Sequence, residues 1–140
     1  MYGTYSHSMD AKGRLFFPAK FREKMGDTVY MCPATNGSYC ISVYSEEGWT
    51  ALTSSISADR SEAAREAEFA LFSNADDSTC DANGRIIINQ NLREYANLSK
   101  TVKIIGLADH VEIWSEETLT EDRKPLSPKE IKQIFGKLGL

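Results

Sequence analysis

The sequence predicts an α+β fold, mainly of strands, in which one small unit occurs twice. Residues 10–23 recur without a gap as residues 81–94, and both copies begin Asp-Ala-x-Gly-Arg and end Arg-Glu. Residues 43–47 recur as residues 113–117 at nearly the same offset. Self-similarity at a fixed spacing indicates a repeat architecture. Short apolar runs bounded by turn residues, which are typical of strands, surround both copies.

The length of 140 residues suits one domain. A half of about seventy residues buries too little surface to be stable alone, so we expect the two units to share one core. We divide the chain into a first repeat at residues 3–48, a helical connector at 49–73, a second repeat at 74–118 and a C-terminal helical tail at 119–140.

Turn and cap residues define the elements of the first repeat. Asp10 to Gly13 is a tight turn, because Asp bonds backbone N–H groups ahead of it and Gly accepts a positive φ. Pro18 is expected at the first helical position, where its missing N–H costs nothing, and Gly26 ends that helix. Asn36-Gly37 is a hairpin cue. The expected strands are 4–10, 14–17, 28–32 and 39–44, and the expected helix is 19–25.

The connector is predicted to be two helices. Ser45 caps the first, which carries Trp49 and Leu52 inward and ends near Ser57. Asp59 is expected to start the second helix, with Glu62 in the capping-box position.

The second repeat follows the same order, and a helical tail comes after it. The expected strands are 85–88, 101–105 and 110–114, the turn is 81–84, the helix is 90–96, and Ser115 caps a last piece of helix. Ser127-Pro128-Lys129-Glu130 is a complete helix start. Apolar residues then recur on one helical face, so we expect this tail to dock on the body or on a neighbouring subunit.

Several classes of function are disfavoured. No apolar run is long enough to span a membrane, and the start of the chain does not resemble a signal peptide. Three cysteines without a framework spacing favour free thiols in the cytoplasm. His7 and His110 lie far apart, no cysteine has metal-ligand spacing, and there is no P-loop or dinucleotide fingerprint. We therefore expect no enzyme activity, no cofactor, no metal and no small-molecule substrate.

Charge is unevenly distributed along this acidic chain. The net charge is −4, yet residues 1–30 carry five cations against three anions, and residues 45–80 carry two cations against eight anions. A local basic face can bind phosphate even when the whole molecule is acidic.

The two Asp-x-x-Gly-Arg turns are the candidate site, and they have two interpretations. Asp10 with Arg14, and likewise Asp81 with Arg85, could form an ion pair that only closes the turn. Alternatively, each arginine holds its guanidinium outward, where it suits the O6 and N7 atoms of guanine. Lys12 and Lys20 would then meet phosphates.

The doubled motif resembles the MraZ family of bacterial transcriptional regulators, which have two SpoVT–AbrB-type repeats. The resemblance covers residues 3–118. It implies a swapped-hairpin β-barrel and a homo-oligomeric ring that binds double-stranded DNA at short G-rich direct repeats. These lie upstream of the cell-division and cell-wall gene cluster, usually for repression, which implies a nucleoid-associated protein. The implied reading residues are Lys12, Arg14 and Arg85, with Lys20 and Asn83 beside them, and the turn-shaping residues are Asp10, Gly13, Asp81 and Gly84.

Three departures and two alternatives accompany this resemblance. Residues 32–34, Cys-Pro-Ala, replace a more polar segment with an arginine that the resemblance implies there. Asn83 stands opposite Lys12, so the second turn is less basic and Arg14 is expected to be the stronger contact. Asn89 stands opposite Pro18, which should leave the second short helix less rigid at its start. The alternative functions are an AbrB-type antitoxin that represses its own operon, and a ring-forming scaffold that binds protein through the acidic connector.

Overall fold

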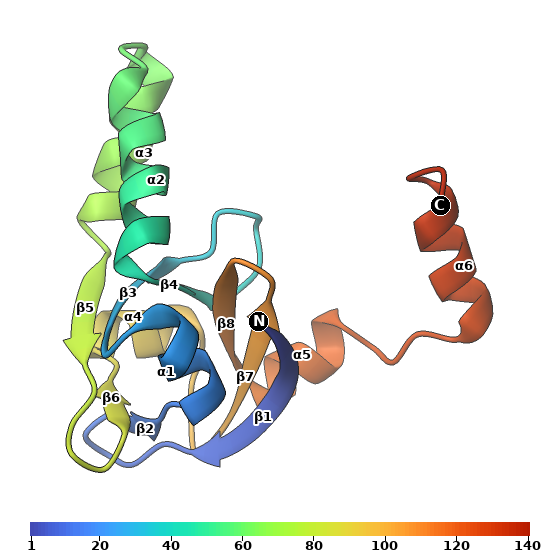
Figure 1. Ribbon diagram of the computed structural model, residues 1–140, viewed down its shortest axis with the longest axis horizontal. Coiled ribbons are helices and arrows are strands. Elements are labelled where there is room, and N and C mark those ends of the chain that lie inside the picture. Colours follow the sequence, from blue (N-terminus) through green and yellow to red (C-terminus); the bar gives the residue numbers. More distant parts are fainter.

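Eight strands and six helices make up most of the protein, and the computed structural model describes all of residues 1–140 (Figure 1). In chain order they are β1 (Tyr2–Ser8), β2 (Arg14–Phe16), α1 (Ala19–Met25), β3 (Thr28–Pro33), β4 (Ile41–Tyr44), α2 (Glu46–Ala58), α3 (Glu62–Phe72), β5 (Asp76–Thr79), β6 (Arg85–Ile87), α4 (Gln90–Tyr95), β7 (Thr101–Leu107), β8 (His110–Ser115), α5 (Glu116–Asp122) and α6 (Pro128–Gly136). The predicted α+β, mainly-strand, tandem-repeat fold is confirmed.

The strands of each repeat pair mainly with strands of the other repeat. The large sheet has the order β1-β7-β8-β4-β3-β5, and β2 pairs with β6 in a separate two-stranded ribbon. β1 of the first repeat lies antiparallel to β7 of the second, and β5 of the second lies antiparallel to β3 of the first. The hairpins are therefore exchanged between the two halves, and neither half completes its sheet alone.

The pairing registers reveal a pseudo-two-fold axis within the chain. Leu15 pairs with Ile86 at the centre of the ribbon, and these two residues occupy equivalent positions in the two copies of the motif. Ser42 pairs with Glu112 at the centre of the β4–β8 pair, which joins equivalent strands in the same way. The axis therefore passes through both pairs and relates each repeat to the other.

One core lies between the ribbon and the large sheet. Leu15 and Ile86 are fully buried from the ribbon, Phe21 and Leu92 are buried from the two short helices, and strand residues complete the same apolar cluster. Both repeats contribute to it, as expected from the small size of each half.

The hydrogen-bonded sheet is not closed into the barrel that the resemblance implied. β1 and β5 are its edge strands, and the one bridge toward the ribbon joins Met9, the residue after β1, to Leu15 of β2. The tight turns after β1 and β5 interrupt the ladder, and the ribbon strands are only three residues long. The ribbon closes the core by packing rather than by continuous hydrogen bonding.

Two predicted helix starts were wrong, one by one residue and the other by two. Pro18 is the N-cap of α1 rather than its first residue, because its ψ of 133° is extended. Ser61, not Asp59, caps α3: Ser61 Oγ accepts the N–H of Ala64, while Asp59 accepts the N–H of Ser61. The side chain of Asp59 thus bonds two residues before the helix cap, in the loop between α2 and α3.

The helices α2 and α3 form a hairpin that projects from the body (Figure 1). Its base is held by aromatic contacts: Trp49 stacks on Tyr30 of β3 with 5.9 Å between ring centroids, and Phe72 meets the same indole edge-on at 6.0 Å. No residue of α2 is fully buried, so Trp49 and Leu52 lie only half inside.

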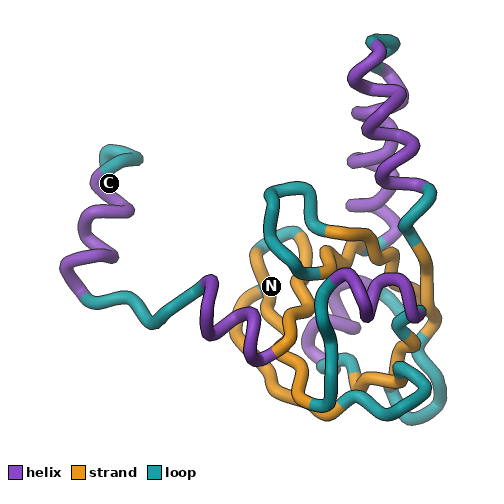
Figure 2. The backbone as a smooth tube through the Cα atoms, turned by 180° about the vertical axis from the view of Figure 1, so that it is seen from behind, coloured by secondary structure: helices purple, strands orange, loops and turns teal.

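The tail does not dock on the body of its own chain, contrary to one of the two expected positions. Figures 1 and 2 both show α6 standing apart from the sheet, and every residue from 121 to 140 is exposed. The expected start signal is present, since Ser127 and Glu130 form a capping box with Pro128 in the first turn.

None of the six helices combines the length and the apolar character that a membrane-spanning segment requires.

Candidate nucleic-acid interface

The first turn is organised around the carboxylate of Asp10. Its Oδ1 accepts the backbone N–H groups of Lys12 at 3.0 Å and Arg14 at 2.9 Å, and its Oδ2 accepts Nε of Arg14 at 2.6 Å. Gly13 donates its N–H to the carbonyl of Asp10 at 3.0 Å and has a φ of +81°. One side chain therefore both closes the turn and fixes the inner edge of a guanidinium.

The second turn repeats this geometry. Asp81 Oδ1 accepts the N–H groups of Asn83 and Arg85, both at 2.9 Å, and its Oδ2 accepts Nε of Arg85 at 2.9 Å. Gly84 has a φ of +78° and donates to the carbonyl of Asp81 at 3.0 Å. The second turn has Asn83 where the first has Lys12, yet the two turns have the same geometry. Only the backbone N–H of this residue takes part in the turn.

Both aspartates are held in the charged form. The backbone N–H of Arg14 is the largest cause that lowers the pKa of Asp10, and the guanidinium of Arg14 lowers it further. The backbone N–H of Arg85 likewise lowers the pKa of Asp81. Hydrogen bonds to an ionised carboxylate favour that form.

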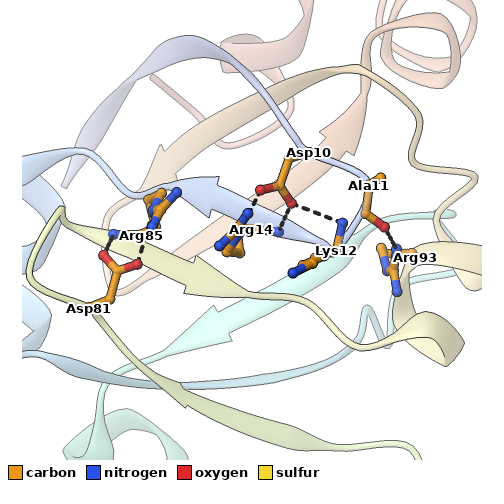
Figure 3. Close-up of polar contacts among 7 residues, drawn as sticks. All are labelled: Asp10, Ala11, Lys12, Arg14, Asp81, Arg85 and Arg93. Atoms are coloured by element: carbon orange, nitrogen blue, oxygen red, sulfur yellow. Dashed lines mark hydrogen bonds and ion pairs between the residues drawn. The ribbon is translucent and has the colours of Figure 1, made fainter.

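The antiparallel register brings the two arginines to one face of the ribbon. Arg14 lies opposite Ile87 and Phe16 lies opposite Arg85, and residues opposite each other in a sheet point to the same side. Leu15 and Ile86 alternate with them and point into the core. Figure 3 shows the two arginines on these neighbouring strands, each facing the aspartate of its own turn.

Both interpretations of the turn are compatible with this arrangement: each arginine closes its turn through an ion pair and also keeps part of its guanidinium exposed. The ion pairs exist, and their side chains are about one-third exposed, at 36% for Arg14 and 32% for Arg85. The pairs use Nε of each arginine. The terminal Nη groups make no hydrogen bond within the protein, so each guanidinium keeps the edge that can donate two hydrogen bonds to an outside acceptor.

Each turn is also supported by the opposite repeat. Ile88 donates its N–H to the carbonyl of Gly13, and Phe17 donates its N–H to the carbonyl of Gly84, both at 2.9 Å. The two bonds are related by the pseudo-two-fold axis. A displacement of one turn would therefore disturb a hydrogen bond to the segment that follows the ribbon strand of the other repeat.

Two further arginines, Arg22 and Arg93, complete this support. Arg93 of α4 reaches the first turn, donating from Nη1 to the carbonyl of Ala11 at 3.4 Å (Figure 3). Arg22 of α1 packs against the second turn, where a Cβ on Gly84 would lie 2.5 Å from its Nη1. They occupy equivalent positions of the repeat and were not singled out as site residues. Both copies of the repeat have arginine at this position, and this shared residue could have indicated their role.

The remaining candidates are placed differently. Lys12 and Asn83 are exposed at equivalent positions in the two turns. Lys20 is exposed on α1, where it lines a hollow with Met1 and Tyr2 that contains no residue of either turn. The structure thus gathers Lys12, Arg14, Asn83 and Arg85 around the ribbon and leaves Lys20 beside the N-terminus.

All three cysteines are free thiols, and Cys80 directly precedes Asp81 of the second turn. Cys32 and Cys40 are buried, and burial raises the pKa of each to about 12, while burial also raises the pKa of the half-buried Cys80. A thiol with so high a pKa stays protonated at neutral pH and is a poor nucleophile.

Comparison with known proteins identifies the family. The family model described as "MraZ protein, putative antitoxin-like" matches residues 1–70 and again residues 71–121. The chain belongs to the MraZ family. Each of the two matched segments contains one copy of the Asp-x-x-Gly-Arg turn.

Curated relatives named "Transcriptional regulator MraZ" are similar over most of their length. The protein from Halothermothrix orenii is 43% identical over 118 residues, covering 82% of this chain and 80% of the relative. That from Caldicellulosiruptor saccharolyticus is 38% identical over 144 aligned positions, covering 100% of this chain and 99% of the relative. That from Acetivibrio thermocellus is 37% identical, covering 99% of each. The MraZ likeness of the last two therefore includes the tail.

Proposed function

We propose that the protein is a sequence-specific DNA-binding transcriptional regulator that acts as a repressor. The observation that carries this proposal is the common face of Arg14 and Arg85 on the β2–β6 ribbon. The relatives are named transcriptional regulators, which supports it.

The ribbon has a shape that suits duplex DNA. A major groove about 12 Å wide admits a two-stranded β-ribbon. Arg14 and Arg85 would donate to guanine O6 and N7, Lys12 and Asn83 would contact the backbone, and the exposed Phe16 and Ile87 could meet thymine methyl groups. Arg14 is the stronger contact in this proposal, because Lys12 accompanies it.

The proposed target is a set of short G-rich direct repeats upstream of cell-division and cell-wall genes. The protein itself would be cytoplasmic and associated with the nucleoid. One ribbon offers few base contacts. Several copies joined in a ring would engage successive repeats at once, and their combined affinity would exceed that of one copy by orders of magnitude. In this view repeats 3–48 and 74–118 face the DNA, while the connector 49–73 and the tail 119–140 serve assembly.

The test compares Arg14→Ala with Arg65→Ala, which removes the same charge from the exposed face of α3. Fluorescence anisotropy is measured on a promoter fragment with direct repeats and on a scrambled fragment. Arg14→Ala should lose about 1–3 kcal/mol of discrimination per engaged copy, whereas Arg65→Ala should bind like the parent. Equal affinity of the two variants for the repeats would refute the proposal.

A conservative variant separates charge from geometry. Arg14→Lys keeps the cation but loses the planar fork. Arg14→Lys should keep most of the salt dependence of binding and lose the preference for the repeats.

Lys12→Ala tests the proposed phosphate contact. It should reduce the slope of log K against log salt by about 0.9 for each phosphate contact removed.

The family is described as antitoxin-like, which favours one second candidate function. An antitoxin would bind a toxin as well as DNA. Co-purification of a stoichiometric toxin from the native host would favour that function, and its absence together with repeat-specific DNA binding would favour the regulator.

A further inference from the structure

The helix α6 exposes an apolar face that nothing in its own chain covers. Ile131, Ile134 and Phe135 are 43%, 44% and 50% exposed, and Leu138 beyond the helix is 73% exposed. These positions recur at i, i+3, i+4 and i+7, which is one side of a helix. A helix of nine residues is too short to be stable alone in water, even with a capping box. It therefore needs a surface to pack on.

A groove of matching character lies at the base of the α2–α3 hairpin. It has a volume of about 400 Å³ and is mainly apolar. One wall is formed by Ile56, Ala67, Ala70 and Leu71 of the hairpin, and the other by residues 33–35 together with α4. The two alanines leave room for a larger side chain. An amphipathic helix laid in an apolar groove is a common mode of recognition.

The charges of the two segments are complementary. Residues 46–72 carry six acidic and two basic side chains, a net charge of −4. Residues 123–140 carry five basic side chains and one acidic side chain, a net charge of +4. Opposite potentials steer two surfaces together and suppress the pairing of either segment with its own kind.

The two segments leave the body on opposite sides of the pseudo-two-fold axis. Ser45 caps α2 and Ser115 caps α5 at equivalent positions of the two repeats. α5 packs on β7 and β8, whereas α2 packs on β3 and β4. Figures 1 and 2 show the hairpin and α6 projecting apart from each other. The tail is therefore directed away from the groove of its own chain.

We propose that α6 of one copy docks in the groove formed by α2, α3 and α4 of a second copy. Ile131, Ile134 and Phe135 enter the groove, and the lysines of the tail face the acidic hairpin. The contact joins different surfaces of the two copies and is therefore head-to-tail. Repeated contacts of this kind form a ring when the rotation between neighbouring copies returns the last copy to the first. This inference rests on the self-assembly in the function proposed above and names the surfaces that make it.

The first test is the solution mass without DNA, measured by light scattering on the full chain. The wild-type protein should be a multi-subunit assembly, and Phe135→Asp should fall toward the mass of one chain, 15.6 kDa. Gln133→Asp places the same charge on the opposite side of α6 and should keep the wild-type mass. Because α6 contacts nothing in its own chain, Phe135→Asp should leave the thermal unfolding of the body intact.

The second test is cross-linking between different chains. A Leu138→Cys protein is mixed with an Ala70→Cys protein, both carrying Cys80→Ser, and treated with a short bismaleimide. Leu138 lies on the same side of the tail as the three docking side chains but is not one of them. A covalent product of the two proteins is expected, and it should be lost when Leu138→Cys is combined with Ile131→Asp. A monomeric wild type, an unchanged mass for Phe135→Asp, or no cross-link between chains would overturn the inference.

These outcomes are independent of DNA recognition. If Phe135→Asp lowers the mass while Arg14→Ala leaves repeat binding unchanged, the docking stands and the proposed regulator fails. If Arg14→Ala abolishes repeat binding while Phe135→Asp keeps the assembled mass, the docking fails and the regulator stands.

Discussion

Gly13 and Gly84 each meet two requirements at one residue. Each has a φ near +80°, and each lies where the opposite repeat passes closest to the turn. The carbonyl groups of these glycines accept the N–H groups of Ile88 and Phe17. A single backbone position therefore shapes the turn and joins it to the other repeat.

Gly13→Ala should cost more than about 2 kcal/mol of the free energy of unfolding. An L-residue with left-handed φ costs about 1–2 kcal/mol, and here the added Cβ would also overlap the carbonyl oxygen of Ile88. Urea denaturation measures the change. Gly37→Ala is the matched control, since Gly37 has a φ of +85° but open space around it, and it should lose only the conformational part. Equal losses at the two positions would contradict the close approach.

The turn aspartates should make stability depend on pH at the acidic end. The pKa of Asp10 and of Asp81 is lower in the folded protein than the ordinary value. Their contribution is therefore fully present above about pH 4 and is lost as the pH falls through the lower folded pKa. Thermal unfolding followed from pH 7 to pH 2 should show a steeper acid loss for the parent than for Asp10→Asn/Asp81→Asn, and identical slopes would argue against it.

At the scale of elements, the α2–α3 hairpin depends on a few aromatic contacts at its base. Trp49 meets Tyr30, Tyr44 and Phe72, while the rest of the hairpin projects from the body (Figure 2). Such a segment should open locally more easily than the sheet.

Phe72→Ala should loosen the hairpin without unfolding the sheet. Phe72 is 45% exposed and packs edge-on to Trp49, so its loss should cost roughly 1–2 kcal/mol. Hydrogen exchange should rise in α2 and α3 and stay unchanged in β7 and β8. Phe69→Ala removes the same side chain from a 77% exposed site one turn away and should stay within about 0.5 kcal/mol of the parent. Both variants are best compared in the Phe135→Asp background, where contacts between copies do not contribute.

For a different element, Asn89 shows how a departure from the repeat is accommodated. Asn89 caps α4 by accepting the N–H of Leu92 at 2.9 Å and donates to Asp76 at 3.1 Å. Its counterpart Pro18 makes no side-chain cap. Asn89→Ala should therefore cost about 1 kcal/mol of stability, measured by urea denaturation. Gln90→Ala, at the next and exposed position, should cost much less, and equal losses would exclude the cap.

At the scale of the whole molecule, the exchanged strands make the two repeats interdependent. Within the first repeat, only β3 and β4 pair with each other. β1 and β2 pair with β7 and β6 of the second repeat, and the other edge of β4 pairs with β8. The shared core follows from this pairing.

The separated halves, residues 1–73 and 74–140, should not fold as monomers. Each lacks the partners for most of its strands, so circular dichroism at low concentration should show little strand structure. Mixing the halves should restore the spectrum and the near-ultraviolet signal of Trp114, which is fully buried in the intact protein. Any folding of one half alone should depend on its concentration, because it requires a second copy, and a folded monomeric half would contradict the exchange.

Local features of the fold followed from the sequence, since they depend on residues close together in the chain. The Asp-x-x-Gly-Arg turns, the caps at Ser45, Ser115 and Ser127, and the positions of most strands reflect positive φ, side-chain caps and hydrophobic period. Two helix starts were misplaced. Pro18 is an N-cap rather than the first helical residue, and Asp59 was chosen in place of Ser61 where two capping residues lie within one turn and compete for neighbouring N–H groups.

The sequence alone therefore determined that two equivalent units exist and which turns hold the arginines. Only the tertiary structure decided which strands of the two repeats pair and in what register, that Arg14 and Arg85 share one face, that Arg22 and Arg93 support the turns, and that α6 is uncovered. Capping and turn chemistry act over a few residues. The pairing of segments about seventy residues apart depends on how the whole chain closes around one core, which no local pattern specifies.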